Sequence, residues 1–251
     1  MQGWRAVVLA LALAGCGTLG DAMPTEPAPA MPAPAPAPTP APRATVASRV
    51  DEVGAEARAR LQPHFARAGV AYPPRALTLV ALKDTARVEV WARTADGWRF
   101  VRGYPVMAAS GARGPKLREG DLQVPEGVYT IDWLNPNSAY HLSMHVDYPN
   151  AFDREHAVGD GRTELGGAIM IHGRAVSVGC LAMGDPAIEE LFTLVADTGL
   201  RDDDGAPRVH AILAPTDLRV HPGATPPPDA PAWTGDLYAL IAQALQPLVR
   251  R

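Results

Sequence analysis

The sequence IMIHGRAVSVGCLAM, Ile169 to Met183, contains a histidine and, eight positions later, a cysteine. Ala168 to Ile171 is an apolar run and predicts a short buried strand that leads directly into His172. Gly173 follows the histidine and Gly179 precedes the cysteine, so the backbone can turn sharply beside each side chain. The stretch therefore predicts two short elements whose connecting loop brings an imidazole and a thiol together.

This pair is a candidate acyl-transfer site. Cys180 is the candidate nucleophile, and His172 is the candidate base that accepts the thiol proton and later donates it to a leaving amine. The amide N–H groups of Gly179 and Cys180 are candidate donors to a developing oxyanion. The carbonyl of Gly173 is a candidate acceptor that orients the imidazole. A buried, chemically inert cysteine is the alternative.

Composition and charge exclude some classes of protein. The chain has 251 residues, of which 47% are apolar, as is usual for a globular protein. Its formal net charge is -4 and no basic cluster is interleaved with aromatic residues, which argues against a nucleic-acid-binding protein. One of its two cysteines lies in a predicted targeting segment, so Cys180 has no disulfide partner.

Residues 1–16 predict a lipoprotein signal peptide. Arg5 precedes the apolar run Ala6 to Leu13, which is well short of the roughly 20 residues that a membrane-spanning helix needs. LAGC at 13–16 resembles a lipobox, which makes Cys16 the candidate lipidation site. Gly17 rather than aspartate follows, and by resemblance to the sorting rule of Gram-negative lipoproteins this indicates the periplasmic side of the outer membrane. An ordinary signal peptide and a soluble periplasmic protein are the alternative.

Residues 17–44 predict an Ala/Pro-rich disordered tether. Pro24 to Pro42 alternates alanine with proline, which lacks the amide donor of a helix. Such a segment extends by about 3 Å per residue, so its roughly 19 residues reach about 60 Å. We expect it to hold the folded part away from a membrane surface.

The remaining chain predicts a mainly β fold with a few packing helices. An N-terminal helical segment is expected at 45–75, a catalytic domain at 76–215, and a proline-rich loop with a C-terminal helix at 216–251. Apolar spacing predicts a helix over Val46 to Ala68, which Pro63 weakens or ends early. Strands are predicted at Leu77–Leu82, Arg87–Ala92, Trp98–Val106, Tyr140–Tyr148 and Val209–Leu213, with a further strand that ends at Trp133.

Other signals concern helix ends and metal ligands. Asp185 is the expected N-cap of a helix that ends near Gly199, and Pro149 to Arg154 is expected to be a polar loop. His141 and His145 are four positions apart, but no glutamate of an HExxH motif and no third ligand accompany them. We therefore predict no metal site and no cofactor, and interpret both histidines as surface or pocket-lining residues.

The motifs together resemble the L,D-transpeptidase (YkuD-type) catalytic domain family, and most closely its YafK-like branch. His172-Gly173 followed by SVGC at 177–180 is similar to the family's HG…SxGC signature. Further similar motifs are GPKLREGD at 114–121, LNPNSAYH at 134–141, YPNAFDR at 148–154 and GCLAM at 179–183. The resemblance extends over about Leu77 to Leu213 and implies a sandwich-like or barrel-like β domain.

The resemblance also implies the chemistry. The Cys180 thiolate would attack the carbonyl of meso-diaminopimelate at position three of a peptidoglycan stem peptide and form a thioester. An amine acceptor would then give a crosslink or attach a lipoprotein. Water as acceptor would make the protein a hydrolase or amidase that releases a wall-attached lipoprotein or cleaves crosslinks.

One departure from the family pattern affects substrate binding. Many members have an arginine two residues after the cysteine, where this sequence has Ala182. Another cation must then bind the substrate carboxylate, and the candidates are Arg154, Arg174 and Lys116. Ser177, in the loop before the cysteine, is a further candidate substrate-binding residue.

Two kinds of partner follow from the resemblance: peptidoglycan stem peptides, and a wall-attached lipoprotein in the release reaction. The membrane is contacted through the lipid anchor alone, and nucleic acid is excluded. A non-catalytic wall-binding lipoprotein that uses the same cleft is the competing class. It would not need the nucleophile or the base, and this sequence has both.

Overall fold

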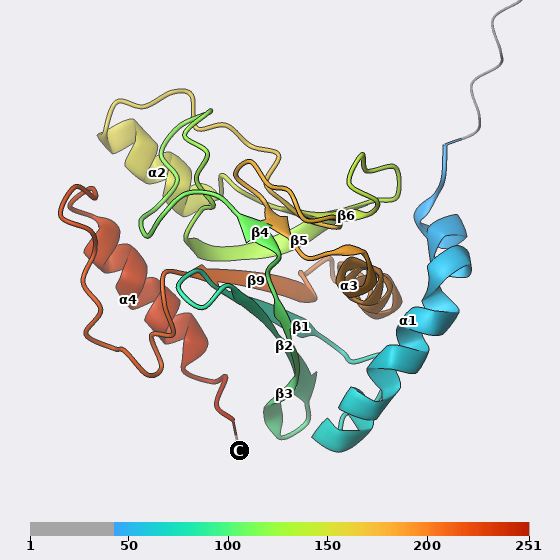
Figure 1. Cartoon of the computed structure of the whole chain (residues 1–251). Coiled ribbons are helices and arrows are strands. Elements are labelled where there is room, and N and C mark those ends of the chain that lie inside the picture. The colour runs from blue at the N-terminus through green and yellow to red at the C-terminus, as the bar shows by residue number, and fades with distance from the viewer. Residues whose placement is uncertain (1–42, 251) are drawn as a thin grey trace, which may run out of the picture. The chain divides into compact units, whose positions relative to one another are not determined.

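The computed structural model describes residues 43–250, which fold around one curved β-sheet with helices on both faces (Figure 1). Within these residues the sheet has nine strands in the order β3-β2-β1-β9-β5-β6-β7-β8-β4, so the mainly β fold class is confirmed. The strands are β1 Leu77–Leu82, β2 Arg87–Thr94, β3 Gly97–Pro105, β4 Ala108–Ala109, β5 Gly127–Asn135, β6 Ser143–Val146, β7 Met170–His172, β8 Leu181–Ala182 and β9 Val209–Ala214. The helices are α1 Val46–Ala68, α2 Ala151–Gly159, α3 Asp185–Thr198 and α4 Thr234–Leu245.

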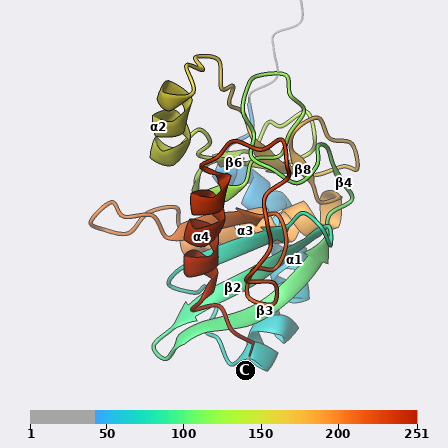
Figure 2. The same cartoon turned by 90° about the vertical axis from the view of Figure 1, so that its left-hand side faces the viewer.

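The central strands are covered on both faces. β1 pairs in parallel with β9 and antiparallel with β2, and all six of its residues are buried. Helices α1 and α3 lie against one face and α4 against the other (Figure 2). Because neither face of β1 meets water, its sequence is nearly continuous apolar rather than alternating. The helical segments predicted at both ends of the folded part therefore pack on this β-sheet.

Helix α1 continues past its proline. Thr45 caps the first turn through a capping box with Ser48, and Gly69 ends the helix in the left-handed conformation. Pro63 lies inside the helix, so the expectation of an early end at this residue is wrong. Leu61 and Phe65, on either side of the proline, are both buried in the core. Their packing offsets the backbone hydrogen bond that the proline cannot make.

A buried carboxylate joins three elements on the α1 and α3 side of the sheet. Glu190 of α3 accepts hydrogen bonds from Arg60 of α1 at 2.8 Å, Arg102 of β3 at 2.5 Å and the Tyr104 hydroxyl at 2.7 Å. A buried charge is tolerated when it is paired and hydrogen-bonded in this way. The network fixes α1 and α3 against the sheet edge formed by β3.

Two elements differ from the sequence expectation. β6 is limited to Ser143–Val146, shorter than the strand predicted over Tyr140–Tyr148, because His141 has a φ of +74° that ends the extended chain. Helix α2 begins inside the segment expected to be a polar loop, where Asn150 and Asp153 form a capping box.

The cap of α3 also differs. Its N-cap is Gly184 and makes no side-chain hydrogen bond. Asp185 is the first residue of the helix, and its carboxylate accepts a hydrogen bond from the Arg174 amide at 2.7 Å instead. Gly199 is the C-cap, as expected.

Some sequence predictions fall outside the described residues. The signal peptide at 1–16, the lipidation site Cys16 and the tether as far as residue 42 are not part of residues 43–250. Between residues 43 and 250, no helix combines the length and the apolar character required to cross a membrane.

Leu237 and Leu240 give a matched test of the packing of α4. Leu237 is 1% exposed and lies in the core between α4 and the sheet, whereas Leu240, on the same helix, is 38% exposed. We expect Leu237→Ala to lower the free energy of unfolding in urea by about 2–5 kcal/mol, because it leaves a cavity. Leu240→Ala should change it by about 0.5 kcal/mol. Equal effects of the two substitutions would contradict this packing.

Candidate active site

The predicted histidine and cysteine lie on neighbouring strands. β7 and β8 are parallel, and His172 of β7 is paired with Ala182 of β8. Cys180 directly precedes β8, and its Sγ lies 3.4 Å from the amide nitrogen of Met170, two residues before His172. The 173–179 loop thus returns the chain beside the histidine, as the sequence predicts.

The imidazole of His172 is held in one tautomer. Its Nδ1 lies 2.6 Å from the carbonyl oxygen of Gly173, and because a carbonyl only accepts, Nδ1 carries the proton. Nε2 of the neutral ring is therefore the acceptor. The side chain is 2% exposed, and the Tyr140 ring lies 4.6 Å from it between centroids. Burial lowers the pKa of His172 and outweighs the opposing effect of the Gly173 carbonyl.

Glycine at 173 allows the close approach of two other segments. A Cβ at this position would lie 2.7 Å from the backbone oxygen of Tyr140 and 2.7 Å from Oδ1 of Asp185. A backbone oxygen cannot move aside as a flexible side chain can. The hydrogen bond to His172 therefore depends on the absence of a side chain at Gly173.

The thiol of Cys180 is half-buried among backbone groups. Its Sγ accepts from the Met170 amide at 3.4 Å and donates to the Ala168 carbonyl at 3.7 Å. Burial raises the pKa of Cys180, and the Met170 N–H and the charge of Lys116 oppose this effect. With the pKa of His172 lowered and that of the thiol raised, the resting pair is a neutral thiol and a neutral imidazole. In the predicted acyl transfer, the thiol proton would move to Nε2 during attack on a substrate.

The two amide donors expected for an oxyanion are engaged in this structure. The Gly179 N–H donates to Oγ of Ser110 at 2.5 Å, and the Cys180 N–H donates to Oγ of Ser177 at 3.0 Å. Ser177 also donates to the Cys180 carbonyl at 2.5 Å, so its hydroxyl holds the loop rather than facing a substrate. To bind an oxyanion, either amide must first release the serine hydroxyl that it now contacts. The oxyanion role of Gly179 stays a prediction.

The three candidate cations occupy different environments. Lys116 is buried, and its Nζ is 2.6 Å from Asp121 and donates to the Arg118 carbonyl at 2.8 Å. Its charge nevertheless acts on the Cys180 thiol. Lys116 is therefore a fixed charge near the nucleophile, neutralised in part by Asp121.

The two arginines are on the surface. Arg154 of α2 donates to the Pro149 carbonyl and lines a shallow hollow with Asp132 and His145. Arg174 is exposed in the loop after the histidine, with a φ of +57°. None of the three cations makes a hydrogen bond to the thiol, and among them only Lys116 acts on the pKa of Cys180 through its charge.

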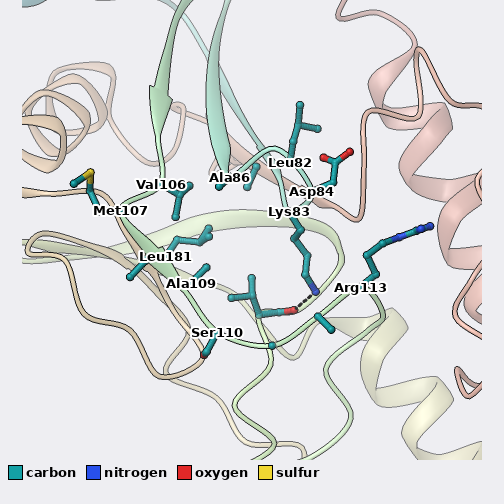
Figure 3. Close-up of a pocket in the computed structure, with 15 residues that line it drawn as sticks. Leu82, Lys83, Asp84, Ala86, Val106, Met107, Ala109, Ser110, Arg113 and Leu181 are labelled. Carbon is teal, nitrogen blue, oxygen red and sulfur yellow. Dashed lines mark hydrogen bonds between the residues drawn. The ribbon is translucent and has the colours of Figure 1, made fainter.

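A cavity of about 380 Å³ is lined by residues that include Ala109 of β4 and Leu181 of β8 (Figure 3). Leu181 and Ser110 line it, but neither Cys180 nor His172 does. At its rim, Lys83 donates to the carbonyls of Gly114 and Val124 at 3.1 and 3.0 Å. Ser110, which accepts a hydrogen bond from the Gly179 amide, connects the cavity to the loop before Cys180.

Two contributors to the site have no local signal in the sequence. Ser110 is 69 positions from the glycine that it contacts, and Tyr140 lies in a loop before β6 yet stacks on His172. Only the pairing of β4 with β8 and of β6 with β7 brings them to the site.

Among residues 43–250, no group of three or more His, Cys, Asp or Glu side chains is arranged to hold a metal ion.

Comparison with known families identifies the domain. Residues 79–213 match the model of the L,D-transpeptidase catalytic domain, YkuD. The Escherichia coli (strain K12) protein named "Putative L,D-transpeptidase YafK" is 34% identical over 115 residues, which are 45% of this chain and 44% of that protein. This chain therefore spans less than half the length of the curated relative that it matches.

Solved structures show distant similarity. The helical cell shape determining protein Pgp2 from Campylobacter jejuni is 21% identical, with a TM-score of 0.46 over 57% of this chain and 48% of the other. L,D-transpeptidase 1 from Mycobacterium tuberculosis is 14% identical, with a TM-score of 0.30 over 55% of this chain and 62% of the other.

The neutral state of the pair is tested by alkylation. In a Cys16→Ser chain, Cys180 is the remaining thiol. We expect the rate of its reaction with iodoacetamide, followed by mass spectrometry, to rise about tenfold per pH unit through neutrality. Burial raises the pKa of Cys180 above the usual 9.0, and below the pKa the thiolate fraction increases about tenfold per pH unit. A rate that reaches a plateau below pH 6.5, the ordinary histidine pKa, would instead show a preformed thiolate–imidazolium pair.

The role of Gly173 is tested by Gly173→Ala. The added Cβ displaces the carbonyl that orients His172, and we expect acylation of Cys180 by p-nitrophenyl acetate to slow by about 100-fold. Gly159→Ala is the control, because a Cβ there meets nothing within 4 Å. Thermal melting of both variants separates a folding defect from a catalytic one. An unchanged rate in Gly173→Ala would contradict the orienting role.

Proposed function

This chain belongs to the YkuD L,D-transpeptidase catalytic domain family, and on that premise we propose that it is a periplasmic cysteine acyl transferase acting on peptidoglycan stem peptides. The residue attacked is the meso-diaminopimelate at position three, and the intermediate is a thioester on Cys180. The observation that carries the proposal is the placement of a tautomer-fixed imidazole at the end of β7 and of a thiol directly before the paired strand β8, against the backbone of β7.

Acylation begins with a proton transfer. Nε2 of His172 accepts the thiol proton as Sγ of Cys180 bonds to the carbonyl carbon of the third residue. The tetrahedral intermediate collapses by breaking the bond to the nitrogen of the following residue. The imidazolium gives its proton to that leaving amine. The products are a thioester on the enzyme and a free amine.

Deacylation reverses these roles. An acceptor amine attacks the thioester carbonyl, His172 takes a proton from it, and the thiol of Cys180 is regenerated when the C–S bond breaks. Water as acceptor gives hydrolysis by the same steps. Because nucleophile and base are common to all acceptors, crosslinking, lipoprotein attachment and lipoprotein release differ in the acceptor and not in the catalytic pair.

We assign binding of the substrate carboxylate to the surface arginines. Ala182, at the position of the arginine of many relatives, is fully buried and carries no charge. Lys116 is held by Asp121 and acts on the thiol instead. Arg154 and Arg174 are the exposed candidates: Arg154 lies on α2, before β7, and Arg174 lies in the loop between β7 and β8.

Delivery to the cell wall is part of the same proposal. A lipid on Cys16 would anchor the chain to the periplasmic side of the outer membrane, and the Ala/Pro tether would let the domain reach the wall. A soluble periplasmic protein is the alternative location.

Acylation by a carbapenem tests the nucleophile. We expect intact-protein mass spectrometry to show one covalent adduct on the wild-type chain and none on Cys180→Ala, because the thiol opens the lactam ring and retains its acyl group. A folded wild-type chain without an adduct would contradict the enzyme and leave the non-catalytic wall-binding protein as the better interpretation.

The identity of the acceptor is tested with purified sacculi. Treatment with the enzyme followed by muropeptide analysis gives new 3–3 dimers if the acceptor is another stem peptide. Loss of a wall-bound lipoprotein remnant indicates hydrolysis.

A further inference from the structure

A row of side chains leads from the nucleophile across the sheet. Trp133 of β5 pairs with His145 of β6, and His145 pairs with Met170 of β7. The Met170 amide in turn donates to Sγ of Cys180. Since directly paired residues point to the same side of a sheet, the side chains of Trp133, His145 and Met170 share one face, which we call the open face. The Met170 amide connects this face to the thiol.

The other side of these strands is core. Met144, Ile171 and Leu181, which alternate with the residues of the row, are buried with α3 in the main hydrophobic cluster. On the open face, by contrast, Trp133 is 49% exposed and His145 is only partly buried. The row is therefore a surface continuous with the candidate active site.

The far end of the row combines an indole with a polar pair. Nδ1 of His145 lies 2.7 Å from Oδ1 of Asp132, and the rings of Trp133 and His145 are 6.3 Å apart between centroids. Asp132 is exposed beside the indole. A flat apolar ring next to a carboxylate and an imidazole suits a ligand that has one apolar face and hydrogen-bonding groups at its edge, such as a sugar ring.

The length of the row matches the proposed substrate. Cys180 and Trp133 are separated by three strand spacings of about 4.8 Å, or about 14 Å in total. A stem peptide from its third residue to its first spans about 10 Å at about 3.5 Å per residue. The sugar that carries the peptide comes directly after the first residue. With the third residue at Cys180, the sugar then reaches Trp133.

We propose that Trp133, with Asp132 and His145, forms a subsite for the sugar ring that carries the stem peptide. The indole stacks on the ring, the Asp132–His145 pair binds its polar substituents, and the peptide crosses Met170 to reach Cys180. This subsite rests on the proposed function. It makes the enzyme selective for stem peptides attached to glycan.

Binding tests the subsite without depending on turnover. The full chain with Cys180→Ala is titrated calorimetrically with a disaccharide tetrapeptide and with the same tetrapeptide lacking the sugars. We expect the glycosylated ligand to bind about fivefold more tightly, a gain of about 1 kcal/mol that is typical of one stacking contact. Adding Trp133→Ala should reduce the affinity ratio to about one, and Trp133→Phe should preserve most of it.

Trp98→Ala is the matched control. Trp98 is also an indole on the sheet, but it lies on β3, at the edge opposite to β4, and it should keep the wild-type ratio. Equal affinity for the two ligands before Trp133 is changed would overturn the subsite. So would a Trp133→Ala chain that weakens both ligands equally, which would assign the indole to peptide binding. Failure of the proposed function is a separate result, the absence of an acyl adduct on the wild-type chain.

Discussion

The hydrogen bond from Nδ1 of His172 to the carbonyl of its own neighbour, Gly173, is the contact on which the rest of the site depends. It fixes the tautomer and leaves Nε2 as the base. The bond persists only because Tyr140 and Asp185 can approach a residue without a side chain. Asp185 belongs to α3, which the buried Glu190 network holds against the sheet. The orientation of one imidazole is thus linked to the packing of α3 against the sheet.

Burial sets the electrostatic state of the pair. It lowers the pKa of His172 and raises that of Cys180, so both groups are neutral at rest. Charge appears only when the proton moves, and at that point Lys116 can favour the thiolate, although Asp121 offsets part of its charge. A neutral resting thiol also reacts slowly with adventitious electrophiles, since the thiolate is the reactive form. In the proposed mechanism, reactivity would therefore depend on the presence of a substrate carbonyl.

Local sequence patterns predict those parts of the site whose residues are close together in the sequence. The apolar run before His172 predicts β7, the glycines predict the turns, and the helical spacing predicts α1, α3 and α4. Two of the misses come from contacts between distant segments. Ser110 engages Gly179 across 69 positions, and α1 passes through Pro63 because its flanking residues are buried. Periodicity has no information on such contacts, because they depend on strand order and register.

Register also decides which face Trp133 occupies. Ile131 pairs with Val146 and Trp133 with His145, so β5 contributes one extra residue, Asp132, between the two pairs. In an unbulged ladder, Trp133 would oppose Met144 and point into the core, because a shift of one residue exchanges the two faces of a strand. The bulge leaves Asp132 and Trp133 both exposed on the open face. A single inserted residue in β5 thereby converts an edge of the hydrophobic core into a surface that is continuous with the nucleophile.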